Sequence, residues 1–181
     1  MTRRPWPWPR RRPAPPPELT AGFALEETAL ATAPTVAGGW LVVTRLGLWV
    51  YQDAVAVQWG WESISRAVLR ERTLTVTVAG VDTVWPDGTA VLLDRPPREF
   101  TLPGPARLTD AVNARVRRSV AASAYLAWPG AGGWVVLRRV PGRDGLLGQV
   151  RLDAGADADT PGFARAVAGR LAELRGPQAP D

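Results

Sequence analysis

The sequence contains no Lys, no His and no Cys, so all 22 of its basic residues are Arg. Without His and Cys, the chain lacks the usual zinc ligands, the common thiol nucleophile and a general base that works near neutral pH. Without Lys, it lacks the cation of a phosphate-binding P-loop and the amine that forms Schiff bases. We therefore expect a protein that is not an enzyme and that needs no cofactor and no metal.

The absence of Cys also excludes a disulfide framework and fits a reducing compartment. No run of residues approaches the ~20 apolar residues of a membrane-spanning helix. Residues 5–9 read Pro-Trp-Pro-Trp-Pro where a signal peptide needs an apolar helical region. We expect a cytoplasmic protein. The Arg-only basic set, with abundant Ala, Gly and Pro, is typical of a GC-rich genome, so it does not by itself indicate phosphate recognition.

The net charge of +5 is concentrated at the N-terminus. Residues 1–20 carry five Arg against Glu18, a net +4, whereas the remaining chain carries seventeen Arg against sixteen acidic residues, a net +1. A nearly neutral body gives little support to nucleic-acid binding by the fold itself. We expect anion binding to be weak, nonspecific and carried by the N-terminal residues.

Residues 1–19 form a leader rich in Arg, Pro and Trp. Pro at alternate positions removes backbone donors and favours an extended polyproline conformation, so we expect the leader to be disordered. Its Trp–Pro–Arg pattern resembles cationic membrane-active peptides of the indolicidin type, in which Arg meets anionic head groups and Trp lies at the interface. A disordered segment with no binding role is the other interpretation. Residues 177–181 are expected to be a tail.

Residues 20–122 have mainly the pattern of β-strands. Apolar runs occupy 40–44 and 48–51, and residues of alternating polarity occupy 55–61 and 73–78. Segments 81–85 and 90–93 flank Pro86-Asp87-Gly88, which predicts a hairpin turn, and 99–102 adds a short strand. Short strands separated by turn residues indicate a barrel or a sandwich.

The period then changes to that of a helix. Leu108, Val112, Val116 and Val120 lie four residues apart and form an apolar stripe, with Thr109 or Asp110 as the expected N-cap. A β-rich body closed by one amphipathic helix is the order of elements found in pleckstrin-homology-like (PH-like) domains.

The end of the chain repeats part of this pattern. Residues 37–45, Ala-Gly-Gly-Trp-Leu-Val-Val-Thr-Arg, are echoed by residues 131–139, Ala-Gly-Gly-Trp-Val-Val-Leu-Arg-Arg. A strand at 146–152 and a helix at 161–174 follow. We predict an α+β fold, in which a PH-like β-barrel is closed by an amphipathic helix and a β-hairpin-plus-helix extension, residues 123–176, packs on it.

The segments 38–45, 47–50, 61–67 and 74–76 together resemble a group of small, uncharacterised actinobacterial proteins, whose first part is similar to bacterial PH-like or GRAM-like domains. The stretch from Asp153 to Pro161 is also similar to that group, so the resemblance covers residues 38–175. It implies a fold and supplies no activity.

Three Asp residues form the most metal-like cluster: Asp153, Asp157 and Asp159. Oxygen ligands could hold a hard cation such as calcium, but the spacing lacks the Gly and the distal Glu of a calcium loop. Asp159 or Thr160 before Pro161 also fits an N-cap and a Pro in the first turn of a helix. We favour the helix start.

The densest basic patch outside the leader lies at and before the predicted helix. Arg107, Arg115, Arg117 and Arg118, with Arg95 and Arg98 nearby, could hold phosphate of a lipid or a nucleic acid, or could simply be a solvated helix face. Six Trp could stack bases, but most alternate with small residues on strands, which favours core packing. They are Trp49, Trp59, Trp61, Trp85, Trp128 and Trp134.

No residue pattern indicates catalysis. Ser63 and Ser65 lie near Glu62, but a serine nucleophile has no base in a chain without His or Lys. We therefore expect a non-enzymatic cytosolic binding or scaffold module with a protein partner. The alternative is a peripheral module that binds anionic membrane or nucleic acid through the leader and the helix at 107–118.

Overall fold

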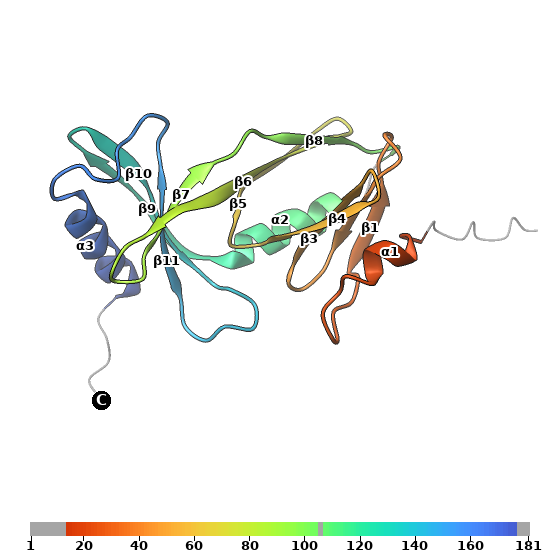
Figure 1. Cartoon of the computed structure of the whole chain (residues 1–181), viewed down its shortest axis with the longest axis horizontal. Coiled ribbons are helices and arrows are strands. Elements are labelled where there is room, and N and C mark those ends of the chain that lie inside the picture. The colour runs from red at the N-terminus through yellow and green to blue at the C-terminus, as the bar shows by residue number, and fades with distance from the viewer. Residues whose placement is uncertain (1–13, 105–106, 177–181) are drawn as a thin grey trace, which may run out of the picture.

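The computed structural model describes residues 14–104 and 107–176 (Figure 1). Residues 1–13, 105–106 and 177–181 lie outside the described residues, and so do the predictions made for most of the leader and for the tail. The described chain is mostly strands with three helices, which confirms the predicted α+β class. None of these helices is long and apolar enough to cross a membrane.

The first sheet has four antiparallel strands in sequence order. They are β1 (Ala31–Pro34), β2 (Trp40–Val43), β3 (Gly47–Gln52) and β4 (Val55–Gly60). The β3–β4 hairpin turns at Asp53 and Ala54, both with positive φ (52° and 61°), as a tight two-residue hairpin turn requires.

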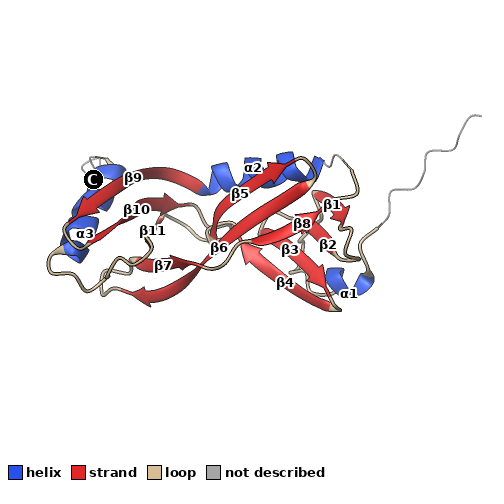
Figure 2. Ribbon diagram, turned by 90° about the horizontal axis from the view of Figure 1, so that it is seen from above, coloured by secondary structure: helices blue, strands red, loops and turns tan. Residues whose placement is uncertain are grey.

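The second sheet has seven strands and curls into a half-barrel (Figure 2). Its order is β5-β6-β7-β11-β10-β9, with β8 paired to β6 outside this path. The strands are β5 (Ile64–Arg70), β6 (Thr73–Val84), β7 (Ala90–Asp94), β8 (Arg98–Thr101), β9 (Val120–Trp128), β10 (Ala131–Arg138) and β11 (Leu147–Leu152).

Strand β6 joins the two halves of the molecule. The sequence predicts separate strands at 73–78 and 81–85, but they form one strand of 12 residues. Its first half pairs with β5 and β8, and its second half pairs with β7 through the predicted hairpin. Gly88 has φ +82° in that hairpin, a conformation that glycine adopts without strain.

Helix α2 (Arg107–Ser119) covers the core between the first sheet and strands β5, β6 and β8. Leu108 and Val112 of its predicted stripe are buried there with Leu41, Trp61 and Phe100. The helix begins two residues before Thr109, so Thr109 and Asp110 lie in its first turn and the predicted N-cap is wrong. Val120 starts β9 instead of ending the helix.

The second core lies between strands β7, β9, β10 and β11 and helix α3 (Phe163–Arg175). Phe163, Val167 and Leu171 of the helix are fully or almost fully buried in it. The predicted extension differs in two ways. It has three strands instead of a hairpin, because Val120–Trp128 also forms a strand. It is also hydrogen-bonded into the larger sheet through the parallel pair β7–β11, instead of only packing on the first part.

A short helix, α1 (Pro17–Thr20), precedes the first sheet. Leu19 is fully buried against Val42 and Trp49, with Phe23 packed on the same cluster. The predicted leader of residues 1–19 therefore extends too far: an apolar side chain before Thr20 is already part of the packed fold.

Candidate anion-binding site

A cavity of about 220 Å³ lies where four segments distant in sequence meet. These are the turn after β2, Trp61 after β4, the end of α2 and the residues after β10. Within the described part of the chain, no carboxylate lines the cavity, whose lining residues are Arg45, Trp61, Arg115, Arg118, Ser119, Arg139, Val140 and Pro141. We call this site the arginine pocket.

The β2–β3 turn presents Arg45 from a fixed backbone. Thr44 is fully buried, and its Oγ1 accepts hydrogen bonds from the backbone N–H groups of Leu46 and Gly47, each at 3.2 Å. The Nε1 of Trp61 donates to the carbonyl oxygens of Thr44 (3.3 Å) and Arg45 (3.2 Å). A side chain at Gly47 would place its Cβ 2.4 Å from the carbonyl oxygen of Trp59, so the turn requires glycine there.

Glu27 anchors this turn from behind. Its Oε1 accepts hydrogen bonds from the Thr44 hydroxyl, from Trp49 Nε1 (2.9 Å) and from Gln58 Nε2 (2.8 Å). Burial by itself would raise the pKa of Glu27, but these hydrogen bonds and one from the backbone of Ala24 outweigh it and hold the pKa below 4.5. Glu27 is therefore ionised at neutral pH, and it organises the turn without lining the cavity.

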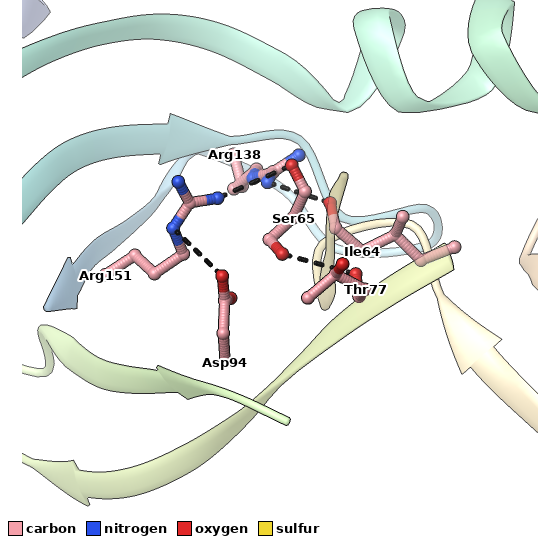
Figure 3. Close-up of polar contacts among 6 residues, drawn as sticks. All are labelled: Ile64, Ser65, Thr77, Asp94, Arg138 and Arg151. Atoms are coloured by element: carbon pink, nitrogen blue, oxygen red, sulfur yellow. Dashed lines mark hydrogen bonds and ion pairs between the residues drawn. The ribbon is translucent and has the colours of Figure 1, made fainter. Parts of the chain in front are cut away.

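Ser119, the last residue of α2 and part of the cavity lining, contacts a buried arginine, Arg138. Arg138, only 6% exposed, donates from Nη1 to Ser119 Oγ (2.6 Å) and from Nη2 to the carbonyl oxygen of Ile64 (3.2 Å). Figure 3 shows the Ile64 contact and the neighbouring Arg151, whose Nη1 donates to the carbonyl oxygen of Ser65 (3.4 Å). Burial first, and then Arg151, lower the pKa of Arg138, while Glu62 opposes them. An arginine remains charged at neutral pH even so.

Arg139 is fixed at the rim. Its backbone N–H donates to the carbonyl oxygen of Ser119 (2.7 Å), and its Nη1 donates to those of Arg118 (3.3 Å) and Val120 (3.1 Å). The bonds to Ser119 and Arg118 satisfy carbonyl groups that the end of a helix leaves without partners. The side-chain bonds also hold the guanidinium of Arg139 against the backbone of Arg118 and Val120.

The arginine pocket has an excess of positive charge. Between described residues, ion pairs join Arg151 to Asp94 (3.8 Å) and Arg170 to Glu173 (3.0 Å), and neither involves the four arginines of the pocket. The carbonyl end of α2 offsets roughly half a unit charge. The cavity lined by Arg45, Arg115, Arg118 and Arg139 therefore carries an excess of positive charge, which favours an anion as its ligand.

The structure brings together two of the four arginines singled out in the sequence. Arg115 and Arg118 lie three residues apart and share one helix face, which lines the cavity. Arg117 is exposed on another face of α2, and Arg107 lies eight residues before Arg115, about 12 Å along the helix at 1.5 Å per residue.

Arg45 and Arg139 were missed as site residues. They are the last residues of the two similar segments 37–45 and 131–139, so the repeat contained the signal that could have identified them. Arg45 lies in the turn after β2 and Arg139 directly follows β10, and both line the same cavity.

The tryptophans belong mostly to the core, as predicted. Trp61 is 1% exposed and Trp49 is 8% exposed. Trp59 packs on Phe100 with the guanidinium of Arg98 5.5 Å from its ring centroid, which gives that arginine of the predicted patch a packing role. Trp85 and Trp128 pack on the second core. Trp134 differs, because 42% of its surface is exposed.

The carboxylates of Asp153 and Asp157 accept hydrogen bonds from different groups. Asp153 accepts the hydroxyl of Tyr125 (2.6 Å), and Asp157 accepts the backbone N–H of Asp159 (2.9 Å). In the described residues, no group of three or more Asp and Glu side chains is placed to hold a metal ion.

The preferred interpretation of the Asp cluster as a helix cap is wrong in detail. The N-cap of α3 is Gly162, with φ +79°, and no side chain caps the helix. Pro161 and Gly162 lie between Thr160 and the first residue of α3. The side chains of Asp159 and Thr160 therefore do not cap the backbone N–H groups of the first turn of the helix.

A larger cavity of about 380 Å³ lies at the start of α3. Asp159 and Arg165 both line it, so its charges offset each other and select no class of ligand. The arginine pocket, with one sign of charge from three segments, is the stronger candidate.

No known family model matches the chain, and no curated protein matches its sequence. The arginine pocket is therefore interpreted from its own chemistry.

Proposed function

We propose that the chain is a non-enzymatic binding module, built on a PH-like β-barrel, that holds a phosphate-bearing group of its partner in the arginine pocket. The observation that carries the proposal is the convergence of Arg45, Arg115, Arg118 and Arg139 on one cavity without a carboxylate.

The order of elements supports the PH-like part of the proposal. Four antiparallel strands form one sheet, β5, β6 and β8 form the facing layer, and α2 follows them and packs on the shared core. In this interpretation, the hairpin formed by the second half of β6 and by β7 is an insertion. The strands of the second half of the molecule pair with it through β7 and β11. This arrangement agrees with the resemblance of the first part to PH-like and GRAM-like domains.

The charge of the pocket favours phosphate over a single carboxylate. A guanidinium group presents a planar fork of donors that fits either anion with two hydrogen bonds. One carboxylate would leave most of the positive charge of four arginines uncompensated. A phosphate group carries up to two negative charges and more acceptor oxygens, so it satisfies more of the donors at the rim.

The surroundings of the pocket support a binding role without catalysis. Among the described residues, Ser119 supplies the one hydroxyl of the lining, and its Oγ donates to the carbonyl oxygen of Val116 (2.7 Å) while accepting from Arg138. Ser63 and Ser65 also donate to carbonyl oxygens, those of Gly60 and Thr77. These hydroxyls have backbone partners instead of a general base.

The proposal is tested with the full chain and pyrophosphate. A ligand that binds only the folded state raises the melting temperature, so pyrophosphate should stabilise the wild-type chain at ~150 mM salt, where exposed long-range charge effects are screened. Arg45→Gln and Arg118→Gln should each remove most of that shift.

Arg117→Gln is the matched control, because it removes the same charge from the same helix without touching the cavity. It should leave the pyrophosphate shift intact. Equal losses in the Arg117 and Arg118 variants, or no shift in the wild type, would refute the site. Vesicles of phosphatidylserine separate a membrane from a phosphorylated protein partner: sedimentation of the wild-type chain with them, lost in Arg118→Gln, would show that a lipid surface carries the anion.

A further inference from the structure

Two aromatic side chains stand exposed on the face of the larger sheet that points away from α3. Tyr125 of β9 and Trp134 of β10 are directly paired across the strands, and 49% and 42% of their surfaces are exposed. Their ring centroids are 5.7 Å apart at 67°. Gly133 and Val135, the neighbours of Trp134, point to the opposite face, where Val135 is buried in the second core. We call Tyr125 and Trp134 the aromatic platform.

The platform is held rigid. The hydroxyl of Tyr125 donates to Asp153 Oδ2 at 2.6 Å, and this hydrogen bond fixes the orientation of the exposed ring. Water could serve an exposed hydroxyl equally well. Gly132 makes this contact possible, because a Cβ there would lie 2.9 Å from Asp153 Oδ2 and 3.0 Å from the Tyr125 hydroxyl. On the other side, Trp134 is paired with Arg151, which contacts Asp94 (Figure 3).

The first half of the molecule contains a similar aromatic pair that is partly buried by other residues of the chain. Trp40 holds the same place in its copy of the repeated segment as Trp134 does in the second, and it is paired with Tyr51 of β3. Leu19 of α1 and Phe23 pack on that pair together with Trp49. The cover comes from the segment that directly follows the prolines of the leader. The chain thus covers one Trp–Tyr pair with its own N-terminal residues and leaves the other open.

We propose that the aromatic platform binds the proline-rich residues 1–13 of a second copy of this chain. Pro at positions 5, 7 and 9 favours the polyproline conformation, which loses little entropy on binding and is recognised by exposed Tyr and Trp rings. The five arginines of this segment complement the carboxylate of Asp153, which accepts the Tyr125 hydroxyl beside the platform, whereas Asp94 is already paired with Arg151. Trp6 and Trp8 add apolar surface for the two rings.

The positions of the two parts in the molecule favour a contact between copies. Residue 14, where the described chain begins, leads into α1 at one end of the molecule, and β9 and β10 lie at the other end (Figure 1). A contact between the leader of one copy and the platform of the next joins unlike surfaces, so it produces head-to-tail association.

The test uses a synthetic peptide of residues 1–13 and a full-length receptor in which Trp6→Ala and Trp8→Ala weaken the receptor's own leader. At ~150 mM salt, the peptide should shift the indole N–H signal of Trp134 in the NMR spectrum. Adding Tyr125→Ala and Trp134→Ala to the receptor should weaken peptide binding, measured by calorimetry, at least tenfold. The wild-type chain should associate more with concentration in sedimentation experiments than the Trp6→Ala, Trp8→Ala chain does.

Two controls separate recognition from charge attraction. Leu146→Ala removes another side chain with a similar exposure, 41%, and should leave peptide binding unchanged. A peptide with Gly in place of Pro5, Pro7 and Pro9 keeps every charge and should bind at least tenfold more weakly. Equal binding by the two peptides, binding that survives loss of both rings, or an unshifted Trp134 signal would each overturn the proposal.

Discussion

Replacing Trp61 with Ala tests whether this one side chain stabilises both the first core and the arginine pocket. Trp61 is 1% exposed and contacts both layers of the core, so its loss leaves a cavity between them. Truncation of a buried Trp costs about 3–5 kcal/mol. In a chain of this size each kcal/mol lowers the melting temperature by about 2–4 °C, so the expected fall is roughly 6–20 °C.

Two other variants set the scale for this measurement. Trp61→Phe keeps most of the apolar surface but loses the N–H donor to Thr44 and Arg45, and it should cost about 1–3 kcal/mol. Trp134→Ala removes a ring that is 42% exposed and should cost about 1 kcal/mol or less. The same residue type thus gives opposite expectations at two positions.

The assay is thermal unfolding followed by circular dichroism, repeated as urea titrations to give the free energy of unfolding. If Trp61→Ala melts like the wild-type chain, the ring is not part of the core and the packing argument fails. If Trp134→Ala falls as far as Trp61→Ala, the aromatic platform has a structural role, and its exposure does not indicate a binding surface.

Three further predictions concern the N-terminal segment and two titrating groups. Deleting residues 1–13 should leave the melting temperature unchanged, whereas Leu19→Ala should cost about 2–5 kcal/mol because Leu19 is fully buried; equal effects would contradict the placement of α1. Although burial opposes it, hydrogen bonding lowers the folded pKa of Glu27, so its contribution to stability is present above pH 4.5 and is lost as the pH falls through that lowered pKa. Acid urea titrations should show this loss in the wild type but not in Glu27→Gln. The hydrogen bond to Asp153 raises the pKa of Tyr125 above 10.0, so in an absorbance titration Asp153→Asn should bring that pKa back down; an unchanged curve would mean that the bond does not form in solution.

Features that depend on neighbouring residues were predictable from the sequence. The alternation at 73–78, the Pro86-Asp87-Gly88 turn and the apolar stripe of Leu108 and Val112 each describe one element and its buried face. Strand β9 was not predictable in this way. Its first half, Val-Ala-Ala-Ser-Ala, has small side chains and no clear alternation, and it is a strand because β10 supplies its hydrogen-bond partners.

The candidate site was only half predictable, for a related reason. Arg115 and Arg118 are neighbours on one helix, so their spacing alone places them together. Arg45 and Arg139 are 94 positions apart. No pattern of neighbouring residues indicates that the strands before Arg45 and Arg139 end at the same cavity. The similarity of segments 37–45 and 131–139 is the one feature of the sequence that connects these two arginines.

The sequence by itself determined the α+β composition, the concentration of charge at the N-terminus and the lack of His, Lys and Cys chemistry, because composition and local periodicity need no knowledge of distant contacts. Only the tertiary structure decided which arginines meet, that Leu19 belongs to the core and that Trp134 faces outward while Trp61 faces inward. These outcomes depend on which face of each strand another element covers. That choice is made by long-range pairings such as β7 with β11, whose free energy is shared among residues far apart in the chain.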